Sequence, residues 1–198
     1  MKKIILVFVS ILLTISCNES NPYLKRLNED FKFFKSKFEP YLISHFPKTI
    51  NNDNNFLICN TDVKNHYVNF FLIESDVKKE RLDSVSKMLN DNPHVTKYKS
   101  NQSCLLKIKK ETKDFLTLSD TCFINKPIPD FSKYPEIDKF YLKSTYDIYV
   151  IDAKPGDVSA KFYLKPMANM PANWENGYSK GITIDYNTKR ISYWTIIW

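Results

Sequence analysis

Glycine is scarce in this chain of 198 residues, which holds only Gly156, Gly177 and Gly181. Loops that cradle phosphates need several glycines at fixed spacing between a strand and a helix, and neither the dinucleotide nor the Walker spacing occurs. The Gly-x-Ser-x-Gly turn that presents a nucleophilic serine is also missing. These absences argue against nucleotide chemistry and against one common class of hydrolase.

Histidine is equally rare, and His45, His66 and His94 have no partner at the spacing of metal ligands. We therefore expect no metal and no cofactor. His66 falls on a predicted strand near Cys59, where a thiol and an imidazole could pair. A buried cysteine beside a strand-edge histidine is the commoner arrangement.

The chain lacks a strong bias toward charge of one sign. Its 29 basic and 22 acidic residues give a formal net charge of +7, and basic residues alternate with acids, as in Lys78-Lys79-Glu80. Binding of nucleic acid needs a concentrated basic stripe, so we expect no nucleic-acid partner. With 43% hydrophobic and 15% aromatic residues, the chain has enough apolar material for a folded core.

A long hydrophobic run occurs from Ile4 to Ile15, between Lys2-Lys3 and Ser16-Cys17. A helix over this run would rise about 18 Å, whereas the hydrocarbon core of a bilayer is about 30 Å thick. The run is too short to span a membrane and predicts a removable signal peptide.

The end of this run resembles a bacterial lipoprotein signal peptide, in which the cysteine after the cut receives a diacylglyceryl group and a further acyl chain such as palmitate. Ser16 and Cys17 fit that pattern, while Thr14 stands where leucine is usual. The resemblance covers residues 1–17 only, and it implies a protein anchored through lipid on Cys17 to a bacterial membrane, facing the periplasm or the cell surface. Cleavage by ordinary signal peptidase after Ser16 is the alternative.

This interpretation divides the chain into three parts. Residues 1–16 form the signal peptide, residues 17–22 form the lipidated N-terminus and a tether, and residues 23–198 form a single domain. Export would place Cys59, Cys104 and Cys122 where disulfides can form. Because Cys104 and Cys122 lie in two neighbouring strand-like stretches, we predict a disulfide between them, with other pairings and a reduced state left open.

Apolar periodicity predicts an α+β fold with a mainly antiparallel sheet, on which N-terminal amphipathic helices and one further helix pack. The first helix spans Leu24 to Phe38, a short one follows over 41–46, and Ser75 or Asp76 is expected to cap the third. The inward-facing residues of the third helix are predicted to be Val77, Leu82, Val85, Met88 and Leu89. Strands are predicted over 56–59, 66–73, 95–99, 103–109, 114–118, 146–151, 160–164, 182–184 and 191–198.

The segment 165–181 is the candidate binding site, because a 17-residue irregular connection is longer than most loops of a compact domain. Trp174 and Tyr178 offer flat amphipathic surface, Met170 adaptable apolar contact, and Asn173 hydrogen bonds. Alternatively, Trp174 and Tyr178 cover the sheet edge, with Gly177 and Gly181 in left-handed backbone.

These features predict a non-catalytic, membrane-anchored envelope lipoprotein that binds a protein, peptide or glycan. Two alternatives stay open: a periplasmic or surface hydrolase that uses His66 or His94, and an immunity or inhibitor lipoprotein that neutralises an exported toxin. Asp147 and Asp152 are predicted to point to opposite faces of one strand, which argues against a cooperating carboxylate pair.

Overall fold

The computed structural model describes residues 21–103, 105–108, 126–131, 145–157, 161–167 and 170–198. The expected signal peptide, Cys17, and the proposed partners Cys104 and Cys122 lie outside these ranges. None of the helices within them has the length and apolar character needed to cross a membrane.

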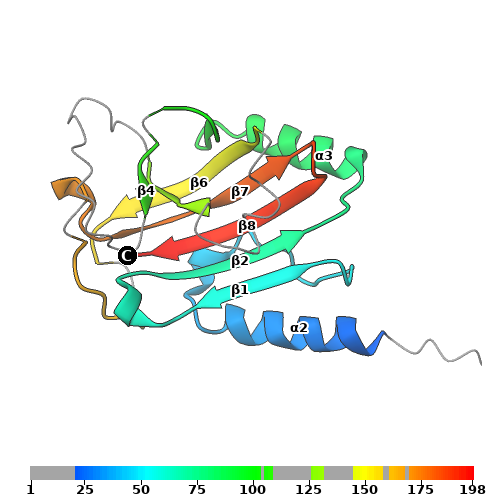
Figure 1. Cartoon of the computed structure of the whole chain (residues 1–198), viewed down its shortest axis with the longest axis horizontal. Helices are drawn as coiled ribbons and strands as arrows, with labels where there is room; N and C mark the ends of the chain where they lie inside the picture. Colours follow the sequence, from blue (N-terminus) through cyan, green and yellow to red (C-terminus); the bar gives the residue numbers. More distant parts are fainter. Residues whose placement is uncertain (1–20, 104, 109–125, 132–144, 158–160, 168–169) are drawn as a thin grey trace, which may run out of the picture.

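A six-stranded sheet organises the molecule, and all its neighbouring strands pair antiparallel (Figure 1). The order across the sheet is β1, β2, β8, β7, β6, β3. The strands span Phe56–Asn60 (β1), Val68–Glu74 (β2), Thr96–Lys99 (β3), Asp147–Pro155 (β6), Gly177–Asp185 (β7) and Arg190–Ile197 (β8). The expected mixture of helices with a mainly antiparallel sheet is confirmed.

The central position of β8 agrees with its composition. Every residue of this strand is buried, because β2 and β7 flank it and both faces of the sheet are covered. The predicted strands over 56–59 and 66–73 correspond to β1 and β2, which pair antiparallel with Phe56 opposite Ile73 and Asn60 opposite Asn69.

Helices cover one face of the sheet. They are α2 (Pro22–Lys35), the 3-10 helix η1 (Pro40–Ile43) and α3 (Lys79–Asn90). Phe70 of β2 is the centre of this core, since its ring lies 5.0 Å from that of Phe46 and 5.9 Å from those of Phe31 and Phe38. The apolar stripe at the start of the domain thus packs on the sheet.

A second core lies on the opposite face. Two short parallel strands, β4 (Lys107–Ile108) and β5 (Ile128–Pro129), pack there in front of the sheet as Figure 1 shows it. The rings of Trp194 and Phe131 approach to 6.1 Å. Two further 3-10 turns, η2 (Val63–Asn65) and η4 (Ala172–Trp174), lie outside the sheet.

Local details differ from several expectations. Neither Ser75 nor Asp76 caps α3, which follows Lys78 without a side-chain cap. Asp76 instead has a positive φ of 55°, and the next residue, Val77, donates its N–H to the carbonyl of Lys189. The chain therefore makes a turn against the β7–β8 hairpin before the helix begins.

Two more predictions are wrong. Met88 is 60% exposed, because the buried side of α3 is formed by Leu82, Ser86 and Leu89. The described part of the predicted strand 160–164 is not a strand. The segment instead packs on the helix-covered core, against which Phe162 and Leu164 are partly buried.

Gly177 and Gly181 of β7 lie in close contact with tryptophan rings, and neither has the left-handed backbone that was the alternative prediction. Gly181 and Gly177 do not have positive φ values, in contrast to Gly156 at 102°. A Cβ on Gly181 would lie 2.5 Å from the Trp194 ring and would collide with the Tyr149 carbonyl. A Cβ on Gly177 would lie 3.0 Å from the Trp198 ring and 2.6 Å from the Lys154 carbonyl. The two indoles thus occupy space that only glycine leaves open.

We predict that Gly181→Ala lowers the free energy of unfolding by about 2 to 3 kcal/mol, because the new methyl group overpacks the sheet. Urea denaturation measures this change. Ser179→Ala is the matched control: Ser179 lies on the same strand and face, and its buried Oγ has no hydrogen-bond partner among the described residues, so its removal should cost little. Equal stability of Gly181→Ala and wild type would contradict the steric argument.

Candidate functional site

The structure separates the four residues predicted to bind a ligand. Strand β7 begins at Gly177, so the last five positions of the segment 165–181 are strand and not loop. Tyr178 is 2% exposed and belongs to the helix-covered core, whereas Trp174 and Met170 pack partly buried against the opposite core. Asn173 is exposed in η4. The four side chains therefore do not form one surface.

Tyr178 is part of a polar cluster beneath η1. Its hydroxyl donates to Asp152 at 2.5 Å, and its ring meets that of Tyr41 edge-on at 5.6 Å. Burial, followed by the Asp152 carboxylate, raises the pKa of Tyr178. The neighbouring buried Lys180 donates to the Tyr41 carbonyl at 2.5 Å and to Ser44 Oγ at 3.4 Å. These bonds fasten η1 to β7 and satisfy the buried ammonium.

His45 lies in the same cluster. Its Nε2 lies 3.0 Å from the carbonyl oxygen of Trp194, and its Nδ1 is buried without a hydrogen-bond partner among the described residues. Removal of the ring from water, reinforced by the charge of Lys180, lowers the pKa of His45 to about 3. The imidazole is therefore neutral at ordinary pH and donates from Nε2 to the sheet.

This arrangement predicts a pH-dependent stability. Between about pH 6.5 and pH 3 the unfolded chain protonates His45 and the folded chain does not, so stability is lost as the pH falls. From pH 7 to pH 5 this residue should remove about 2 kcal/mol of unfolding free energy. Urea denaturation should show a smaller loss for His45→Gln, whereas His94→Gln, at an exposed position, should behave like wild type. An unchanged pH profile in His45→Gln would contradict the assignment.

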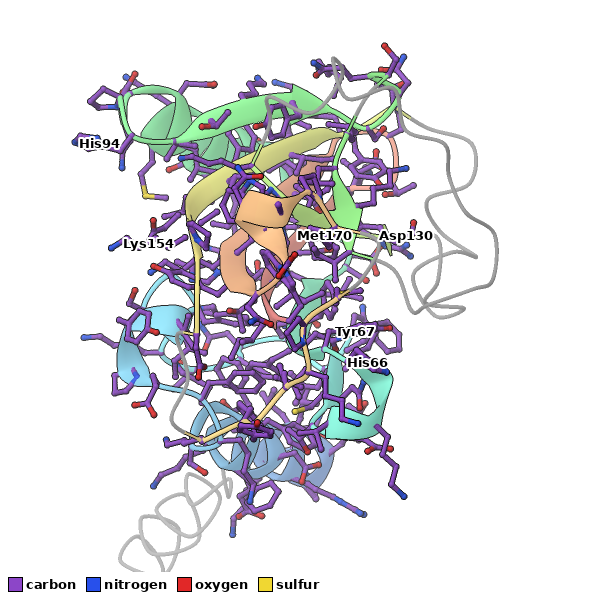
Figure 2. The ribbon with its side chains drawn as sticks, turned by 90° about the vertical axis from the view of Figure 1, so that its left-hand side faces the viewer. His66, Tyr67, His94, Asp130, Lys154 and Met170 are labelled. Atoms are coloured by element: carbon purple, nitrogen blue, oxygen red, sulfur yellow. The ribbon has the colours of Figure 1, made fainter. Side chains whose placement is uncertain are left out.

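The histidines of the hydrolase alternative have no catalytic partner among the described residues. His66 and His94 lie far apart in Figure 2, and no hydrogen bond joins either ring to a described acid, serine or cysteine. Burial raises the pKa of the Cys59 thiol to about 11, so this cysteine is protonated near neutral pH. No group of three metal-binding side chains occurs in the described part of the chain.

The prediction that Asp147 and Asp152 point to opposite faces of one strand is wrong. Asp147 lies opposite Ile184 and Asp152 lies opposite Lys180, so both project from the helix-covered face. A β-bulge between Val150 and Asp152 inserts the residue that changes the alternation. Asp147 pairs with Lys97 at 3.0 Å and also with Lys99, while Asp152 accepts from Tyr178. Each carboxylate thus has its own partners, and no hydrogen bond joins these two described side chains.

A pocket of about 200 Å³ lies at the carboxyl end of β8. Its wall comes from the segment that follows β6, from the end of the loop before β7, and from the last residues of β8. It is lined by Asp157, Phe162, Tyr163, Leu164, Pro166, Asn176, Ile197 and Trp198. The lining combines aromatic and aliphatic side chains with the polar side chains of Asp157 and Asn176.

Backbone hydrogen bonds hold this pocket in shape. Gly177 and Trp198 exchange two main-chain hydrogen bonds, at 2.9 and 3.0 Å. The Trp198 Nε1 donates to the carbonyl of Trp174 at 2.8 Å, which fixes the indole. Phe162 packs 5.6 Å from the ring of Phe38 on the helix side, and Met167 is buried on the other side. The segment 161–167 therefore crosses from one core to the other and closes the end of the sheet.

No family model, curated protein or solved structure matches this chain. The assignment of the candidate site therefore comes from its geometry alone.

The sequence pointed to part of this pocket. Pro166 and Asn176 fall within the predicted binding segment, and Trp174 supplies the acceptor for Trp198. The sequence pattern predicts a strand over Phe162 to Leu164 and places Trp198 at the end of the last strand, whereas the structure has all of these residues in the pocket wall. No local sequence pattern could have shown that these residues line a pocket, because the pocket forms where two segments distant in the chain meet.

Proposed function

We propose that this protein is a lipid-anchored binding protein of a bacterial envelope, tethered through Cys17 and carrying the pocket at Trp198 as its binding site. The pocket is the observation that carries the binding part of the proposal. The lipoprotein-type leader carries the anchoring part. The N-terminal helices would connect the anchor to the sheet.

The position of the pocket supports this arrangement. The helix α2 begins at Pro22, so a tether of residues 17–21 would reach at most about 18 Å from the acylated cysteine. In Figure 1 the start of α2 and the carboxyl terminus lie at opposite ends of the molecule. A pocket beside Trp198 would then open away from the membrane, toward ligands in water.

The volume of the pocket sets the size of the ligand. A cavity of about 150 Å³ in another protein holds benzene. The 200 Å³ here would admit one aromatic ring with a short substituent, or an apolar side chain of a peptide. Because the pocket is this small, a larger ligand such as a glycan or a protein could insert only one of its groups into it.

The anchor is tested on the mature protein from its native envelope. Mass spectrometry should find an N-terminal Cys17 that carries acyl chains, and wild-type protein should partition into the detergent phase. Cys17→Ser should move the protein to the aqueous phase, since several acyl chains are needed for firm anchoring. A mature chain that starts at another residue, or that carries no lipid, would overturn the anchoring proposal.

Binding is tested at the rim of the pocket with a one-ring probe, 2-phenylethylamine, followed by ligand-observed NMR. Tyr163 is 89% exposed, so Tyr163→Ala should preserve the melting temperature while weakening binding about three- to tenfold through loss of ring contact. Tyr23→Ala is the matched control, because Tyr23 is 55% exposed on α2, away from the pocket. Equal binding by both variants would show that the probe does not use this site.

A further inference from the structure

We propose that the outer face of α2 lies on the membrane surface and binds anionic phospholipid headgroups. This inference rests on the proposed anchor at Cys17, and it names a second contact between the same membrane and the folded domain. The inner side of α2 packs on the sheet, with Leu27 and Phe31 buried. The opposite side of the helix, on which the contact would form, is exposed to solvent.

Two aromatic side chains belong to this outer face. Tyr23 and Phe33 are each 55% exposed, whereas the apolar residues of the inner side pack against the core. The positions of Tyr23, Arg26, Asp30, Phe33 and Lys37 are three and four residues apart in turn, which places them on one side of the helix and of the turn after it. Exposed aromatic rings in such a row suit the boundary between lipid headgroups and acyl chains.

The charge of the outer face complements an anionic surface. The Lys37 ammonium lies 4.3 Å from the centre of the Phe33 ring, so a cation and an aromatic ring are presented together. Each lysine or arginine near an anionic leaflet strengthens attachment about fivefold. Exposed cations outnumber exposed acids by four to two: Lys25, Arg26, Lys32 and Lys37 against Glu29 and Asp30.

A short tether would bring this face to the membrane. Residues 17–21 precede α2, so an acylated Cys17 would hold the first turn of the helix within about 18 Å of the bilayer. Such a tether makes a weak contact effective, because it raises the local concentration of the helix at the surface. In Figures 1 and 2, α2 lies along the lower border of the molecule, and in Figure 1 β1 and β2 separate it from β8. The contact therefore leaves the pocket beside Trp198 off the bilayer.

The test uses the full mature chain with Cys17→Ser, so that binding to vesicles reports the protein surface and not the acyl chains. Sedimentation compares vesicles made of equal parts phosphatidylglycerol and phosphatidylcholine with vesicles of phosphatidylcholine alone. We expect binding to the anionic vesicles at millimolar lipid and low ionic strength, with release as the salt concentration rises. Vesicles of phosphatidylcholine alone should bind at least tenfold more weakly.

Substitutions that change charge test the polar part of the contact. Arg26→Gln should weaken binding to the anionic vesicles about fivefold, because one cation is lost near the surface. Asp30→Asn should strengthen it by a similar factor, because an acid leaves the same face. Lys87→Gln is the matched control: Lys87 is exposed in the last turn of α3, at the opposite border of the molecule in Figure 1, and its loss should leave binding unchanged.

Phe33→Ala tests the aromatic part of the contact. Binding to the anionic vesicles should weaken about tenfold, because the exposed half of the ring no longer enters the interface. The melting temperature should stay the same, since the ring is more than half exposed in the folded protein. Met88→Ala is the matched control, because Met88 is 60% exposed on α3, and it should bind as the parent does.

The outcomes separate this inference from the anchor. Failure of the Cys17→Ser chain to bind either kind of vesicle, or equal weakening by the α2 and α3 variants, would overturn the membrane contact and leave the anchor standing. A mature chain without lipid would overturn the anchor, while vesicle binding that Arg26→Gln and Phe33→Ala weaken would support the contact. A dimer that Phe33→Ala dissociates, without vesicle binding, would overturn the contact and assign this face to a second copy of the chain.

Discussion

The close approach of two indole rings to two glycines of β7 is the contact on which the rest of the sheet depends. Trp194 and Trp198 are almost fully buried, and they lie where a Cβ on Gly181 or Gly177 would stand. The carbonyl oxygens of Tyr149 and Lys154 on β6 close in on the same two positions from the other side, so β7 fits between β6 and β8 there only as glycine. Because Trp198 is then held by the Trp174 carbonyl, one wall of the pocket is a consequence of the same packing.

The two faces of the sheet are closed by different means, and the pocket lies where they meet. On the helix side, aromatic packing around Phe70 is supplemented by polar bonds from Lys180 to the short helix η1. On the other side, the indoles and the small β4–β5 pair form the core. The segment 161–167 contributes to both cores, so its middle residues line the space that neither core fills.

Periodicity predicted the elements whose contacts are local or repeat regularly. The hairpin of β1 and β2, the central apolar strand β8 and the body of α3 follow from alternating or helical spacing of apolar residues. The exceptions have identifiable causes. Asp152 changes face because a bulge adds one residue to β6. In the stretch 161–164, Phe162 and Leu164 pack on the helix-covered core and do not pair as a strand.

The sequence by itself predicted the mainly antiparallel class of the fold, which the structure confirms, because this class depends on residue type and on neighbours a few positions away. The lipoprotein-type leader and a general region for binding are predictions from the same kind of local pattern. Only the tertiary structure decided which strands are neighbours, why β7 needs glycine, and which side chains form the pocket. Those properties depend on residues distant in the chain: Lys180 meets Tyr41 from 139 positions away, and Trp198 meets Trp174 from 24. The burial of Asn176 likewise follows from surrounding segments that no local pattern specifies.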